Sequence, residues 1–297
     1  MALTLLVQQL INAVSLGSIY ALVAIGLAMV FSILHMINFA HGEMMMIGAF
    51  TYLFLVTSGA NPILSLVVAG AAGALGGLLM ERLAYRPVRG SADVTLLLTS
   101  FAVSMLLQNL GILFWTSRSR PFPVPEALAG TIELGGFGIS RVYLLCVLVS
   151  LLLLAALSWF IGRTSMGVAM RAAAEDLMAA RLAGVAIDRV VATAFVIGSA
   201  LAAVAGLLWG VRAGKIDPLM GFEPLLKAFV ATVVGGFGSL SGAVLGSFLV
   251  AFVEVFAQGY LPTGFTGYRD GVLFLVLILF LVFRPQGILG SEEAERA

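Results

Sequence analysis

Long apolar runs alternate with short polar connections along the whole chain. A helix needs about 20 mostly apolar residues to cross the hydrocarbon core of a membrane. The runs that approach this length cover residues 7–34, 39–57, 63–85, 94–115, 142–161, 190–211, 225–234, 243–256 and 271–283. This pattern predicts an all-α, polytopic transmembrane helix bundle with about eight to ten spans. We expect it to form one transmembrane domain over residues 1–297.

Two of these runs depart from the simple pattern. The run 39–57 begins in a polar segment that contains glycine, and the run 225–234 is too short to cross unaided. Irregular backbone persists at membrane depth only where protein or a water-filled cavity surrounds it. The sequence therefore predicts one or two discontinuous spans.

Composition supports the membrane assignment and excludes other classes. Hydrophobic residues make up 61% of the chain and charged residues only 10%, against about 25% charged in an ordinary soluble domain. The net charge is +1 and the only lysines are Lys215 and Lys227, which argues against nucleic-acid binding. The lone Cys146 can form no internal disulfide. The first ten residues lack a basic stretch, so we expect a retained first helix and not a cleaved signal peptide.

Arginines in the connecting loops predict the orientation. Cytoplasmic loops of membrane proteins carry an excess of Arg and Lys. We expect three arginine-bearing stretches to be cytoplasmic: 82–89, 162–190 and the stretch after the last span, which begins with Arg284. The stretch 116–141 is rich in proline and suits an irregular exterior loop.

The polar segment Asn38, His41 and Glu43 is the first candidate functional site. An intramembrane carboxylate is costly and usually faces a bundle interior or a cavity. These residues are therefore predicted to line or brace a solute pathway. The alternative is a helix start in which Asn38 is the cap and Glu43 lies near the positive end. A metal site is not expected, because His35 is the only other histidine and no cysteine is near.

The charged loop, residues 162–190, is the second candidate. It is rich in Ala, Arg, Glu and Met, which favour helix. Arg171 and Glu175 are four residues apart and can pair on one helix face, and Gly184 is placed to end or bend the helix. We expect a short amphipathic helix followed by a glycine turn. It could dock into a partner or lie on lipid.

The glycine-rich segment 233–243 is the third candidate. It contains Gly235, Gly236, Gly238 and Gly242, but it lacks the Gly-Lys-Ser/Thr ending of a nucleotide-binding loop. We interpret it as a close-packed helical hairpin or a broken helix. Elsewhere, Glu254 is a second intramembrane carboxylate on the predicted pathway, and Lys227 is a possible partner for it.

Four motifs together resemble the permease family of branched-chain amino acid ABC importers. They are INFAHGE at 37–43, MRAAAED at 170–176 followed by LAGV at 182–185, KAF at 227–229 followed by VGGFGSLSGA at 234–243, and FRPQG at 283–287. The resemblance covers nearly the whole chain.

The resemblance implies a function and a set of partners. It implies a bacterial inner-membrane permease, without its own ATPase activity or cofactor, that pairs with a second related permease or with itself. Two cytoplasmic ATPases and a periplasmic amino-acid-binding protein would complete an importer that works by alternating access. It also implies that the charged loop matches the ATPase-coupling segment of ABC permeases, with Arg171, Ala174, Glu175, Asp176 and Gly184 as its site residues. Here Ala-Ala-Ala-Glu replaces a clean Glu-Ala-Ala.

Two other functions remain open at this stage. Related permeases of this family carry urea or short amides in place of branched-chain amino acids. A channel or secondary carrier without ATPases would instead use Glu43 or Glu254 as an ion or proton site. Copurification with an ATPase separates the importer from the carrier.

Overall fold

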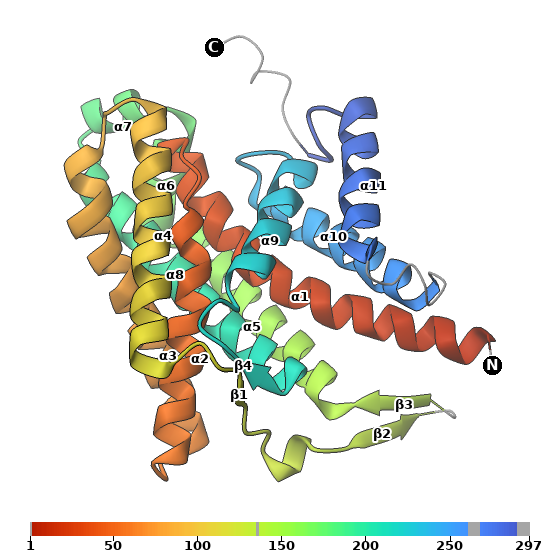
Figure 1. Cartoon of the computed structure of the whole chain (residues 1–297). Helices are drawn as coiled ribbons and strands as arrows, with labels where there is room; N and C mark the ends of the chain where they lie inside the picture. The colour runs from red at the N-terminus through yellow and green to blue at the C-terminus, as the bar shows by residue number, and fades with distance from the viewer. Residues whose placement is uncertain (1, 135–136, 261–267, 290–297) are drawn as a thin grey trace.

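The computed structural model describes residues 2–134, 137–260 and 268–289, and it is almost entirely helical (Figure 1). The helices are α1 Ala2–Leu34, α2 Glu43–Thr57, α3 Pro62–Met80, α4 Asp93–Trp115, α5 Arg141–Arg163, α6 Ser165–Glu175, α7 Leu177–Leu182, α8 Ile187–Ala213, α9 Phe222–Gly235, α10 Leu240–Tyr260 and α11 Arg269–Phe283. Short helical turns are η1 Phe39–Gly42, η2 Glu81–Tyr85, η3 Arg86–Val88 and η4 Glu126–Leu128. The strands are β1 Arg120–Pro121, β2 Thr131–Leu134, β3 Phe137–Ser140 and β4 Lys215–Ile216. The predicted all-α fold is confirmed.

Seven helical stretches of the described chain are long and apolar enough to cross a membrane. They are Leu5–Leu34, Phe39–Thr57, Pro62–Val88, Asp93–Trp115, Arg141–Arg163, Ile187–Ala213 and Leu240–Tyr260. α9 and α11 are shorter, with 14 and 15 residues. The irregular start predicted for the second span is the 3₁₀ turn η1, and the short predicted run 225–234 is the body of α9.

The bundle is built around α1, which packs against α8, α9, α10 and α5. Small residues allow the central helices to approach closely. A Cβ atom added to Gly26 of α1 would lie 3.0 Å from the Cα atom of Gly198 in α8. Close packing of small residues is the usual way that helices associate in lipid. α4 and α5 lie at the periphery and expose rows of large apolar side chains, among them Leu98, Leu106, Leu148 and Leu152.

The connecting segments gather at two opposite ends of the bundle (Figure 1). At one end lie α6, α7 and the η2–η3 turns, and Arg86 of η3 forms an ion pair with Asp188 at the start of α8. At the other end, β1 pairs antiparallel with β4 and β2 pairs antiparallel with β3. The segment predicted as an irregular exterior loop therefore contains a hairpin. It lies at the end opposite the charged loop, as the loop arginines predict.

Candidate functional site

A break in the helical chain separates α1 from α2. His35 follows the end of α1 with a φ of 53°, a backbone conformation that is uncommon for residues other than glycine. Asn38 then caps η1, since its Oδ1 accepts a hydrogen bond from the Ala40 backbone N–H at 3.1 Å. The same Oδ1 accepts a hydrogen bond from the Tyr85 hydroxyl at 2.7 Å. Asn38 is thus a helix cap, as the alternative prediction of a helix start expected. Its hydrogen bond with Tyr85 also connects this break to η2.

Glu43, the first residue of α2, is fully buried. Its Oε1 accepts hydrogen bonds from Ser104 Oγ at 3.0 Å and from Gln108 Nε2 at 2.8 Å, both on α4. Its Oε2 has no hydrogen-bond partner among the described residues, and none of the ion pairs there includes Glu43. A buried carboxyl group with neutral donors alone is costly to keep charged. Its role in a pathway stays a prediction.

His41 lies on the other side of the same break. It is buried against Gly26 of α1, and a Cβ atom added to Gly26 would lie 2.7 Å from His41 Nε2. No hydrogen bond or ion pair joins it to Glu43 in the described chain. Asn38, His41 and Glu43 therefore lie in one short segment, but their side chains contact different neighbours.

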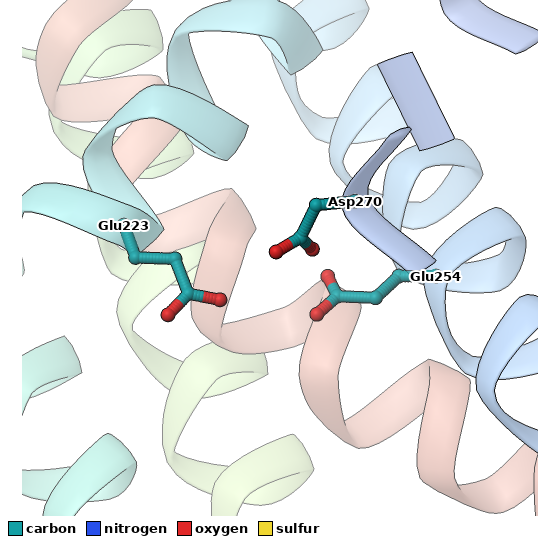
Figure 2. Close-up of side chains that lie close together, drawn as sticks. All are labelled: Glu223, Glu254 and Asp270. Carbon is teal, nitrogen blue, oxygen red and sulfur yellow. The ribbon is translucent and has the colours of Figure 1, made fainter. Parts of the chain in front are cut away.

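Glu254 belongs to a separate cluster of charged side chains. Lys227 Nζ of α9 lies 2.6 Å from Glu254 Oε1 of α10, 2.6 Å from Glu223 Oε1 and 3.3 Å from Asp270 Oδ1 at the start of α11. Tyr20 of α1 donates its hydroxyl to Glu254 Oε2 at 2.8 Å. Figure 2 shows the three carboxylates converging from α9, α10 and α11. The structure thus contains the ion pair between Lys227 and Glu254 that the sequence suggested.

The charge balance of this cluster is uneven. One oxygen atom from each of the three carboxylates lies within 4.8 Å of the other two, and like charges this close repel. The Lys227 ammonium supplies positive charge in their midst, where a bound cation would otherwise be required. Lys227 and Glu254 are buried, whereas Glu223 and Asp270 are half exposed. We therefore interpret the cluster as a set of polar contacts that holds α1, α9, α10 and α11 together, and not as a metal site.

The glycine-rich segment forms the turn between α9 and α10. Gly236 and Gly238 have φ values of 104° and 83°, which only glycine adopts without strain. Gly235 and Gly242 face each other so closely that a Cβ on either would overlap the other's backbone. The segment after α11 closes this turn, because Ile288 N donates to Val234 O at 2.8 Å. The arrangement is a close-packed hairpin, and its action as a hinge stays a prediction.

The charged loop differs from the single helix that its composition suggests. It contains two helices, α6 and α7, which are separated at Asp176. Asp176 Oδ1 accepts hydrogen bonds from Met178 N at 2.8 Å and Ala179 N at 2.9 Å, and such a cap begins a new helix. Gly184 follows α7 with a φ of 86° and has nothing within 4 Å of its added Cβ. The predicted glycine turn is therefore present.

Arg171 does not form the predicted ion pair with Glu175 in the structure. Its guanidinium instead donates to the Ile161 carbonyl oxygen in the last turn of α5. The last carbonyl groups of a helix lack hydrogen-bond partners within the helix. Arg171 supplies such a partner to the Ile161 carbonyl oxygen, which the sequence pattern does not reveal. Arg171 also lines a groove of about 650 Å³ between α1, α5 and α10. Ala174 is half-buried, whereas Glu175 is exposed.

Four charged side chains connect the charged loop with the η2–η3 turns. Arg86 Nη2 lies 2.7 Å from Asp188 Oδ2, and Arg89 Nη1 lies 2.6 Å from Asp188 Oδ1. The Nη2 of Arg89 also pairs with Glu81 Oε1. Glu81 is buried, although Arg86 and Asp188 are exposed. The two arginines and two acids balance in charge.

The sequence pattern does not reveal several residues of these networks, chiefly Tyr20, Glu81, Tyr85, Ser104 and Asp188. Most of them form contacts with residues far away in the chain, such as Tyr20 with Glu254, whose residue numbers differ by 234. The i, i+4 spacing of Glu223 and Lys227 was a signal in the sequence, because such residues share a helix face.

Comparison with known proteins places these features in a family. Residues 9–281 match the family model described as the permease component of branched-chain amino acid transport systems. The chain is 42% identical to the high-affinity branched-chain amino acid transport system permease protein LivH of Salmonella typhimurium, over 97% of each chain. It is 40% identical to the corresponding permease protein BraD of Pseudomonas aeruginosa, again over 97% of each chain.

A more distant relative is also similar over most of the chain. The probable branched-chain amino acid transport permease protein LivH of Methanocaldococcus jannaschii is 28% identical, over 95% of this chain and 91% of that protein. No solved structure matches the chain. The seven apolar helices together with the bacterial permease relatives indicate a multi-pass protein of the inner membrane. The chain belongs to the family of permease components of branched-chain amino acid transport systems.

Proposed function

We propose that the chain is the membrane-spanning permease of an ATP-driven importer that carries branched-chain amino acids by alternating access. The observation that carries this proposal is the 42% identity, over 97% of both chains, to a permease named for branched-chain amino acid transport. The chain itself has no Gly-Lys-Ser/Thr nucleotide loop. An ATP-driven importer of this kind would therefore take its energy from separate ATPase subunits.

The charged loop is the surface to which those ATPases would bind. Its helices lie at the same end of the bundle as η3 (Figure 1), and Arg86 of η3 forms an ion pair with Asp188 of this loop. Met178 and Leu182 of α7 expose most of their apolar side chains, and exposed apolar residues on a charged helix fit a groove in a partner. The Gly184 turn allows α7 to move relative to α8, since its backbone bonds are unhindered by a side chain.

The mechanism follows from these positions. ATP binding would close two ATPase subunits, the charged loop would transmit this motion, and the bundle would open outward to accept solute from a binding protein. Hydrolysis would return it inward. A second permease, related or identical, would provide the other half of the pathway. The peripheral apolar faces of α4 and α5 are available to lipid or to that second permease.

Asn38, His41 and Glu43 are proposed to brace the pathway in the conformation described here. Glu43 is held by two neutral donors from α4, and α4 is among the least buried spans. A small displacement of α4 would expose the carboxyl group. Glu254 is proposed to hold α9 and α10 in register beside the pathway through its contacts with Lys227 and Tyr20.

Uptake by the complete complex in proteoliposomes tests the proposal. Leucine, isoleucine, valine, urea and short amides would be offered with ATP trapped inside or outside the vesicles. We expect ATP-dependent uptake of the three branched-chain amino acids. Uptake of urea or amides alone would replace the substrate assignment. Gradient-driven uptake by the permease without ATPases would replace the importer with a channel or secondary carrier.

A further inference from the structure

The short turns η2 and η3 interrupt the end of the third span in an unusual way. η2 is a π-helical turn over Glu81–Tyr85 that continues α3, and η3 contains Pro87. π-helical turns are rare and are often found at functional positions. Pro87 has no N–H group and ends the helical hydrogen-bond pattern. Arg89 follows directly, and its side chain turns back onto η2.

Arg89 contacts two acids that belong to different parts of the molecule. One terminal nitrogen, Nη2, pairs with Glu81 of η2, and the other, Nη1, lies 2.6 Å from Asp188 Oδ1. Asp188 is in the first turn of α8, four residues after Gly184. A planar guanidinium can contact two acids at once, whereas a lysine ammonium is a single point of charge.

The two contacts of Arg89 differ in their surroundings. The Glu81 side chain is only 2% exposed, and it needs a positive partner because an unpaired buried charge is strongly unfavourable. The Asp188 side chain is 59% exposed, and exposed ion pairs are weak and are easily exchanged for water. Arg89 is thus firmly attached to the bundle and loosely attached to the charged loop.

The bundle side of this contact leads to the buried break. Tyr85, at the end of the same π-helical turn, donates its hydroxyl to Asn38 at 2.7 Å. Asn38 caps η1, which leads into Glu43. Leu177 of α7 joins Arg89 and Tyr85 in lining one small cavity of about 250 Å³. The charged loop and the break are therefore connected through neighbouring side chains.

We propose that Arg89 is a positioning residue for transport: its bridge between Asp188 and Glu81 transmits movement of the charged loop, through Tyr85 and Asn38, to the buried segment that holds Glu43. This inference rests on the proposed function, because it requires a loop that is moved by an ATPase. Spatial continuity alone is not coupling, so the test must change the bridge and leave the charge or the fold in place.

The first experiment uses Arg89→Lys, Arg89→Gln and Asp188→Asn in the reconstituted complex. Arg82→Gln is the matched control, since Arg82 is an exposed arginine of η2 that takes no part in the bridge. We expect Arg89→Lys and Asp188→Asn, which keep a positive charge beside Glu81, to assemble with the ATPases and to keep basal ATP hydrolysis. Arg89→Gln leaves the buried Glu81 without its positive partner, so it should also lower the amount of assembled complex. Stimulation of hydrolysis by the loaded binding protein should fall at least about 5-fold, the lower range of allosteric coupling. Arg89→Gln combined with Asp188→Asn should be less impaired than the sum of the two single changes, because both remove the Arg89–Asp188 contact.

Two outcomes of that experiment would overturn the bridge. If Arg89→Lys restores full stimulation, charge is sufficient and the two-sided contact is not used. If the variants lose assembled complex but keep normal stimulation per complex, Arg89 is only structural. A wild-type complex that shows no response to the binding protein would count against the proposed function itself.

Hydrogen exchange on the permease alone tests the bridge independently of any ATPase. We expect Arg89→Gln to increase amide exchange both in η2 and in the first turn of α8, with the Arg82→Gln control unchanged. An increase on one side only, or on neither, would overturn the linkage even if the importer assignment stands.

Discussion

Removal of the buried ammonium of Lys227 is expected to destabilise the bundle more than removal of any one of its acidic partners. Lys227 is 2% exposed and contacts three carboxylates, two of them at 2.6 Å. Breaking a buried ion pair from one side costs about 3–5 kcal/mol, because the remaining charge is left without compensation. Lys227→Met would leave Glu254 in that state, with only the Tyr20 hydroxyl as a donor. The two half-exposed acids add about 0–1 kcal/mol each.

The partner variants should rank below Lys227→Met. Glu254→Gln leaves Lys227 with Glu223 and Asp270 and keeps an acceptor for Tyr20, so we expect a loss of about 1.5 kcal/mol, the lower value for a charged hydrogen bond. Glu223→Gln removes an i, i+4 contact of a half-exposed acid, for about 0.3–0.5 kcal/mol.

The double variant Lys227→Met/Glu254→Gln tests whether the loss of stability in Lys227→Met comes from the uncompensated charge of Glu254. Replacing both members of a buried pair by neutral groups of similar size is often close to neutral. The double variant should therefore recover at least half of the loss in Lys227→Met. The assay is the apparent melting temperature of the purified permease at one fixed heating rate, because unfolding of a protein of this kind is commonly irreversible. A loss of about 3 kcal/mol corresponds to roughly 6–12 °C. A double variant less stable than Lys227→Met would refute the argument.

Three further predictions concern the ends of the bundle and the two other candidate sites. Cysteines introduced at the exposed positions Arg181 and Glu126 should react with a membrane-impermeant reagent from opposite sides of the membrane, and the buried Cys146 should stay unlabelled; labelling from one side would contradict the topology. Glu43→Gln should lower uptake but change the free energy of unfolding by no more than about 1 kcal/mol, because the amide oxygen can still accept a hydrogen bond from α4. Unchanged uptake would leave Glu43 as a structural group. Gly184→Val should insert normally but lose solute-stimulated ATP hydrolysis, since a β-branched residue is strained at a φ of 86°; full stimulation would remove this turn from the coupling element.

The candidate site was only partly visible in the sequence. Asn38, His41 and Glu43 stood out because polar groups are rare in an apolar run, and Gly184 stood out as a helix stop. The partners of these residues did not stand out. Ser104 and Gln108 are ordinary polar residues of a spanning helix, and only the packing of α4 on η1 brings them to Glu43. For Arg171 the sequence predicted a contact that the structure does not contain. Its spacing to Glu175 predicted a local ion pair, but its guanidinium donates to the Ile161 carbonyl oxygen instead.

The sequence by itself determined that this chain is a helical membrane protein, because nearly 20 apolar residues in a row leave no other way to satisfy the backbone in lipid. It also indicated which loops carry the excess of arginine and which residues end the helices, since charge bias and backbone preference are local properties. Only the tertiary structure decided that Lys227 lies among three carboxylates and that Arg89 joins Asp188 to Glu81. Such contacts join residues that are far apart in the chain, and their geometry depends on how whole helices pack, which no local pattern specifies.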